Sequence, residues 1–167
     1  MSHTVAAILI LGFVTVQRLA ELWLAERNRA RLLEQGAVEY GAGHFPLIVA
    51  VHAAWLAALW WWAPGRPISI PLLVAFAALQ AARVWIIGTL GERWTTRIIV
   101  LADAPLVNRG AYRFVDHPNY IVVVLEIAVL PLVFGLWQIA VIFSLLNAAV
   151  LTIRIGAENR ALRSLRR

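Results

Sequence analysis

Long apolar stretches dominate the chain, and most polar residues lie between them. The hydrocarbon layer of a bilayer is about 30 Å thick and requires roughly 20 helical residues per crossing. Five stretches approach that length, namely residues 4–24, 45–63, 70–90, 120–134 and 136–156. The sequence therefore predicts an all-α, polytopic integral membrane protein with about five transmembrane helices.

The last two predicted spans form a C-terminal helical hairpin. Pro131 and Gly135 interrupt the apolar pattern between them, and no charged residue lies between Ile127 and Ile153. Such a pattern is compatible with a hairpin that crosses the bilayer and with a re-entrant pair that does not. No internal repeat divides the chain, so we expect one domain, 1–167, with three N-terminal spans (1–90), a polar cytoplasmic loop (91–119) and the hairpin with its tail (120–167).

Composition narrows the classes of function. The chain is 62% apolar and 14% charged, whereas soluble proteins average about 25% charged residues. It has no cysteine, which excludes disulfides, thiolate metal sites and a cysteine nucleophile. The usual metal-hydrolase, nucleotide-binding and serine-hydrolase motifs are also missing, and we expect no metal site. All fifteen cationic side chains are arginine, which in so apolar a chain indicates contact with membrane lipids and no nucleic-acid partner.

The arginines predict the orientation. They follow the first and third spans and fill the tail, whereas the opposite side has only Arg66. Because cytoplasmic loops retain positive charge, five spans with the N-terminus outside and the C-terminus cytoplasmic satisfy this distribution. We expect a bacterial-type inner or plasma membrane, with Trp60, Trp61 and Trp62 in the outer aromatic belt.

The polar loop ends in a group of residues capable of chemistry, directly before an apolar helix. Pro118 suits the first turn of a helix, because its missing N–H costs nothing there. His117 then lies at the membrane boundary and Tyr120 one turn inside, so both can face one pocket. The alternative is that Pro118 only starts the span while Tyr120 is an interfacial anchor.

Glu126 lies inside an otherwise apolar helix. A central acidic residue costs roughly 2.5–3.5 kcal/mol on insertion scales, so such a group normally faces a partner or a watery cavity. We interpret Glu126 as a functional candidate, with a structural ion pair to Arg83 or Arg154 as the alternative.

The last span has a polar stripe that we expect to face protein. Its members share one helical face by their spacing: Ser144, Asn147, Arg154 and Glu158. Arg154 before Glu158 is the less favourable order for an intrahelical ion pair, which favours function over that alternative. Further polar residues on the first and third spans snorkel or pair: Gln17, Arg18, Glu21, Gln80 and Arg83. His44 lies at a glycine-rich boundary, and His52 lies within a span, where a histidine is more often a packing residue than a catalyst.

Two motifs resemble those of the isoprenylcysteine carboxyl methyltransferase family. Residues 110–120 resemble its Gly-Pro-Tyr-Arg-Tyr-x-Arg-His-Pro-x-Tyr motif, and residues 154–159 resemble its Arg-Ile-x-x-Glu-Glu motif. They occur in the family's order around a helical hairpin, and the N-terminal half resembles a bacterial branch of that family. Asp116 replaces the family's usual Arg and Asn159 replaces its second Glu, which puts in doubt a cationic contact and an anionic contact to the cofactor.

The resemblance implies a membrane methyltransferase that uses S-adenosylmethionine from the cytoplasm. It implies transfer of a methyl group to an oxygen of a lipophilic acceptor from the bilayer, such as an alkylpyrone-type polyketide or an isoprenoid acid. The residues that it places at the cofactor are Leu106, Val107, Gly110, His117, Pro118, Tyr120 and Glu158. As catalytic residues we assign Arg154 to orient the acceptor anion, and Glu158 with Glu126 to polar orientation.

Two other functions stay open at this point. A lipid-amine N-methyltransferase would need a base such as His44 to supply a neutral nitrogen. A small transporter or scaffold would account for the intramembrane Glu126 and Arg83 without any cofactor.

Overall fold

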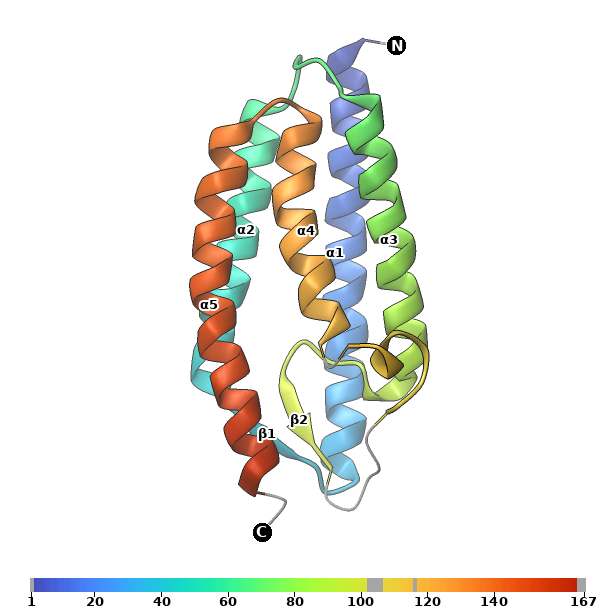
Figure 1. Ribbon diagram of the computed structural model, residues 1–167, viewed down its shortest axis with the longest axis vertical. Helices are drawn as coiled ribbons and strands as arrows, with labels where there is room; N and C mark the ends of the chain where they lie inside the picture. Colours follow the sequence, from blue (N-terminus) through green and yellow to red (C-terminus); the bar gives the residue numbers. More distant parts are fainter. Residues whose placement is uncertain (1, 102–106, 116, 165–167) are drawn as a thin grey trace.

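The computed structural model describes residues 2–101, 107–115 and 117–164. The described residues form five α-helices that run along one long axis: α1 (His3–Glu34), α2 (Phe45–Trp62), α3 (Ile70–Leu90), α4 (Pro118–Val133) and α5 (Trp137–Ser164). The first helix begins and the last one ends at opposite ends of the bundle (Figure 1). Four of these helices, α1, α2, α3 and α5, are long and apolar enough to cross a membrane. The predicted all-α polytopic membrane fold is thereby confirmed.

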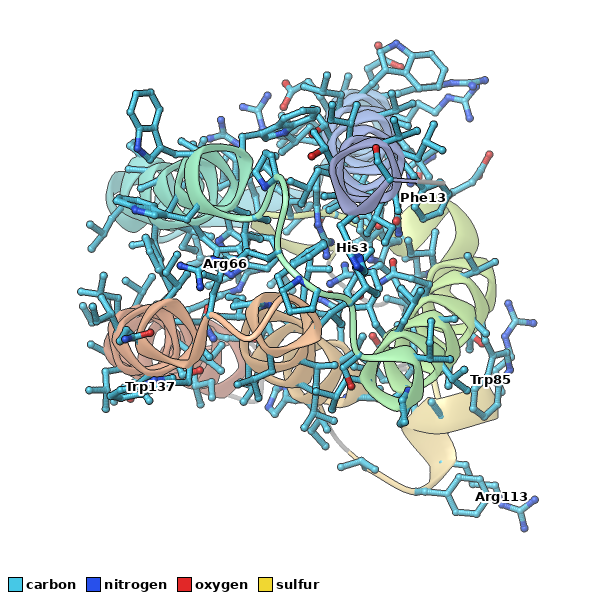
Figure 2. The ribbon with its side chains drawn as sticks, turned by 90° about the horizontal axis from the view of Figure 1, so that it is seen from above. His3, Phe13, Arg66, Trp85, Arg113 and Trp137 are labelled. Atoms are coloured by element: carbon cyan, nitrogen blue, oxygen red, sulfur yellow. The ribbon has the colours of Figure 1, made fainter. Side chains whose placement is uncertain are left out.

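The helices form two layers. Seen along the bundle, α5, α4 and α3 form one row, and α2 and α1 form a second row beside it (Figure 2). The shared core is dry towards the N-terminus of α1, where Leu11, Leu59 and Leu130 have no exposed surface. Many side chains on the outside of the bundle are apolar, as expected of a surface that faces lipid; Trp61 is 79% exposed.

The first helix is longer than its predicted span. It continues ten residues beyond Leu24, so Arg27, Arg29 and Arg31 lie on α1 and not in a loop. The extension is rich in good helix formers and contains no Gly or Pro, and Arg29 pairs with Glu26 one turn away at 2.6 Å. Apolar length predicts where a span ends but not where its helix ends.

A tight turn joins α4 to α5. The N–H of Leu136 donates to the carbonyl of Pro131 at 3.0 Å, and Gly135 takes a positive φ of 68° between them. This is the helix-ending pattern that favours glycine. The predicted helical hairpin is confirmed, with α4 only 16 residues long.

Short elements cover one end of the bundle, which we call the sheet end (Figure 1). Strands β1 (Val38–Tyr40) and β2 (Ile98–Val100) pair in antiparallel fashion, with Glu39 opposite Ile99. Three 3-10 helices complete this end: η1 (Ala42–His44), η2 (Gly91–Arg93) and η3 (Gly110–Arg113). The sequence pattern did not predict the strands.

Candidate functional site

The hydroxyl of Tyr120 is the centre of a polar cluster near the sheet end. It donates to the carboxylate of Glu158 and accepts from Nε of Arg154 at 2.8 Å. Arg154 and Glu158 thus reach from α5 to the same atom of α4, and no ion pair between the two is recorded in the described part of the chain. The intrahelical pair considered from the sequence is replaced by a contact between helices. We call these three residues with His117 the tyrosine cluster.

The start of α4 positions the tyrosine cluster. Pro118 takes the first helical position, and His117 precedes it as the N-cap residue, as the sequence predicts. The carbonyl of His117 accepts from the N–H of Tyr120 at 3.1 Å. Their rings stack, with centroids 5.1 Å apart and 18° between the planes. His117 Nδ1 also lies 4.0 Å from Glu158, so one carboxylate faces both rings.

Arg154 connects the tyrosine cluster to the loop before β2. Its Nη1 donates to the carbonyl of Thr96 at 2.6 Å. That loop is in turn attached to the sheet end through Glu39, which accepts from Arg97 at 2.7 Å and from Arg29 at 2.8 Å. Burial raises the pKa of the Glu39 carboxyl, but the hydrogen bonds from the two arginines outweigh it, and the net pKa lies below its ordinary value.

Glu126 lies in a second, separate cluster. It is 1% exposed and accepts from Arg83 Nε at 2.8 Å, from Arg18 at 2.8 Å and from Gln80 at 2.8 Å. Glu21 accepts from one further nitrogen of each arginine, Nη1 of Arg18 at 2.8 Å and Nη1 of Arg83 at 3.3 Å. These five residues, the ion-pair cluster, hold two cations and two anions. The structure therefore places Glu126 with Arg83, as the sequence-based alternative expected, and not with Arg154.

A cavity of about 250 Å³ joins the two clusters. Tyr120 and Arg154 line one part of it, and Arg18 and Arg83 line another. Most of the remaining wall is apolar and comes from α1, α2 and α5: Leu19, Leu22, Ile48, Val49, Ala53, Leu56, Val150 and Leu151. Glu126 is not among the lining residues; it lies against Arg18 and Arg83, which are.

The rim of the cavity lies on the outside of the bundle. Leu19 and Leu22 line it and are 62% and 39% exposed. Nearer the N-terminus of α1, Trp60 Nε1 donates to Thr15 Oγ1 at 3.0 Å and joins α2 to α1. The cavity therefore opens sideways between α1 and α2, on the apolar surface of the bundle.

Three buried polar atoms of cavity-lining residues have no hydrogen-bond partner among the described residues. Nε of Arg18 and Nε1 of Trp94 are donors, and Oδ1 of Asn119 is an acceptor. Buried polar groups are normally paired, and an orphan needs an explanation such as a missing ligand or water.

Of the tyrosine cluster, Tyr120 and Arg154 line the cavity, whereas His117 and Glu158 contact Tyr120 without being lining residues. The cavity and the cluster beside it thus present donors, acceptors, both charges and an aromatic face.

The remaining residues named from the sequence differ in what the structure says of them. Gly110 has a φ of 58°, and a Cβ there would lie 2.7 Å from Thr89 Oγ1, so packing of η3 on α3 already requires glycine. Val107 is half-buried before η3. Leu106 and Asp116, and the side chains of His44 and Asn159, lie outside the described residues.

Sequence reasoning missed several lining residues. Four of them come from the predicted polar loop: Trp94, Thr95, Thr96 and Asn119. The first three belong to no motif, and Asn119 occupies the variable position of the His-Pro-x-Tyr segment. Tyr112 lies near Glu158, whose charge adds to burial in raising the pKa of the Tyr112 phenol to about 12. In the sequence, Tyr112 stood out only as a member of the motif at residues 110–120.

Fold and site together define a polytopic membrane protein with a polar cluster near one end and a cavity with mostly apolar walls beside it. Residues 71–164 match the model of the isoprenylcysteine carboxyl methyltransferase (ICMT) family, and the chain belongs to this family of S-adenosylmethionine-dependent membrane methyltransferases.

Two relatives match over most of the chain. Uncharacterized protein YpbQ of Bacillus subtilis (strain 168) is 33% identical, over 92% of this chain and 95% of the relative. An uncharacterized protein of Haemophilus influenzae (strain ATCC 51907) is 26% identical, over 87% of this chain and 88% of the relative. No solved structure matches the chain.

Proposed function

We propose that this protein transfers the methyl group of S-adenosylmethionine to an oxygen of a lipophilic acceptor, such as an isoprenoid acid or an alkylpyrone-type polyketide. The observation that supports this best is the single cavity that joins the tyrosine cluster to the lipid-facing side of α1 and α2. A water-soluble ligand can thus reach the cavity from the aqueous side and a lipophilic one from the bilayer.

The tyrosine cluster is suited to hold the cofactor. Glu158 offers an anion to its ammonium group, and the stacked rings of His117 and Tyr120 offer an aromatic wall. When bound, S-adenosylmethionine supplies an electrophilic methyl group on a cationic sulfonium. Glu126 contributes at a distance, because it holds Arg18 and Arg83 in place at the cavity.

Positioning is the main task of the protein in such a reaction. Holding two reactants at attack distance contributes up to roughly 7–11 kcal/mol in favourable cases. The apolar walls exclude water, and a transfer that neutralises charge is favoured in such surroundings. Arg154 is placed to orient an anionic acceptor oxygen, since it lines the cavity and touches Tyr120.

The orientation follows from charge. The sheet end carries Arg93, Arg97, Arg109 and the arginines of the α1 extension, whereas the segment between α2 and α3, which contains Arg66, lies at the other end (Figure 1). By the positive-inside rule the sheet end faces the cytoplasm, which is where S-adenosylmethionine is made. The N-terminus is then outside.

Two measurements test the proposal. Detergent-solubilised protein should bind S-adenosylhomocysteine in a calorimeter, and it should transfer isotope-labelled methyl groups into a total lipid extract, with the product mass separating an O-methyl from an N-methyl group. Glu158→Ala should abolish transfer in a folded protein, whereas Glu92→Ala, an exposed carboxylate at the same end, should not. Absence of cofactor binding by the native protein would refute the assignment.

A further inference from the structure

His52 is a histidine in the cavity wall that none of the contacts described above uses. It lies on α2, and its Nδ1 is 2.9 Å from the carbonyl oxygen of Ile48, one turn earlier on the same helix. A carbonyl oxygen can only accept, so Nδ1 carries the proton. In the neutral ring Nε2 is then an unprotonated acceptor, and no partner for it is recorded within the described residues.

The surroundings of His52 restrict what can bind to it. Its neighbours on α2 along the cavity are apolar, Val49, Ala53 and Leu56. The nearby cations Arg18 and Arg83 are balanced by Glu21 and Glu126. A carboxylate has no hydrogen to donate to Nε2 and would meet no spare cation at this point, whereas a hydroxyl group can donate and adds no charge.

The position of His52 also suits a bilayer ligand. The same cavity is rimmed by the exposed Leu19 and Leu22 of α1, so an alkyl chain can extend into lipid while its polar head lies inside. An acceptor nitrogen in a mostly apolar cavity favours a ligand that can donate a hydrogen bond to it over one that cannot. His52 therefore favours a lipophilic ligand whose head group donates a hydrogen bond over one whose head group is apolar.

We propose that the cavity binds its lipophilic acceptor through a hydroxyl group that donates a hydrogen bond to Nε2 of His52. The inference rests on the proposed function and narrows the acceptor to a hydroxylated lipophile of the phenol or alcohol type. It gives His52 a role in recognition, separate from the tyrosine cluster.

Nitrogen NMR on the native protein tests the first step. The chain has four histidines, so ¹⁵N-histidine labelling gives few signals, and the loss of one set in His52→Gln assigns His52. We expect an unprotonated Nε2 that shifts when 4-dodecylphenol is added and stays unchanged with dodecylbenzene. A protonated Nε2 with an unprotonated Nδ1, or a signal that the phenol leaves unmoved, would overturn the proposal.

Binding selectivity tests the second step. At a fixed detergent concentration the native protein should bind 4-dodecylphenol about 3- to 10-fold more tightly than dodecylbenzene, which corresponds to one neutral hydrogen bond. His52→Phe should lose this preference, and His52→Gln should keep part of it because its amide oxygen can accept. Val49→Ala, the control, should weaken both ligands equally.

The two proposals fail in different ways. S-adenosylhomocysteine binding should be the same in the native protein and all three variants. Normal cofactor binding without a preference for the phenol refutes the role of His52 alone. A phenol preference that depends on His52 in a protein that binds no S-adenosylhomocysteine refutes the methyltransferase assignment and keeps the hydroxyl site.

Discussion

Glu126→Gln removes one of two anions from the buried ion-pair cluster while keeping the size of the side chain. Glu126 is 1% exposed and Arg83 3% exposed, so the lost contact lies away from bulk water. Breaking a buried pair by removing one partner typically costs about 3–5 kcal/mol. Glu21 still accepts from Arg18 at 2.8 Å and from Arg83 at 3.3 Å, so we expect a loss at the lower end, about 3 kcal/mol.

That loss is measurable as a shift in thermal stability. For a chain of this size 1 kcal/mol corresponds to roughly 2–4 °C, so the midpoint followed by tryptophan fluorescence in detergent should fall by about 6–12 °C. The matched variant is Arg83→Met with Glu126→Leu, which removes a cation and an anion together. It leaves Arg18 and Glu21 as mutual partners, and it should be more stable than Glu126→Gln because paired removal of buried charges is often close to neutral.

Either of two results would refute this account of the cluster: a midpoint that moves by less than about 2 °C in Glu126→Gln, or a double variant no more stable than the single one. Glu126→Gln also tests the predicted catalytic role of this residue. If it acts only by holding Arg18 and Arg83, transfer per folded molecule should fall through acceptor binding, with an unchanged affinity for S-adenosylhomocysteine.

Three further outcomes are expected at the sheet end and the hairpin turn. Gly110→Ala should lower the thermal midpoint more than Gly135→Ala, because both have positive φ but only the first meets a neighbour's side chain. The lowered pKa of Glu39 means that its stabilising contacts are complete above the ordinary carboxyl pKa and are lost as pH falls through the folded value. The protection of β1 amides from hydrogen exchange, measured relative to the intrinsic rate at each pH, should therefore fall on acidification in the native protein but not in Glu39→Gln. Ultraviolet titration should show Tyr112 ionising near pH 12, and at lower pH in Glu158→Gln, because that carboxylate opposes the phenolate; an unchanged titration would contradict their proximity.

Much of the fold could be predicted because apolar length is a local property. The bounds of α3, 70–90, are those expected from the sequence, and the turn at Gly135 was marked by its residue type. Part of the tyrosine cluster could be predicted as well: Pro118 marks the start of α4, and spacing puts Arg154 and Glu158 on one helical face. That these residues belong to one site with His117 and Tyr120 was implied only by the family resemblance.

The parts that could not be predicted depend on pairing between distant segments. Strand β1 meets β2 across some sixty residues, and three-residue strands have too little pattern to be recognised. The sequence left Glu126 with two possible partners, and only packing of α3 against α4 selects Arg83. His52 had no local signal either, because its importance comes from a cavity that the four other helices also line.

In the proposed reaction, the sideways opening between α1 and α2 sets the concentration scale for the lipophilic acceptor. A molecule that enters from the hydrocarbon phase is counted per lipid molecule, and not per volume of buffer. Extra phospholipid should therefore dilute the acceptor and slow its methylation even when the amounts of enzyme and acceptor in the tube are constant. The water-soluble methyl donor, which enters at the sheet end, should keep its ordinary dependence on bulk molarity.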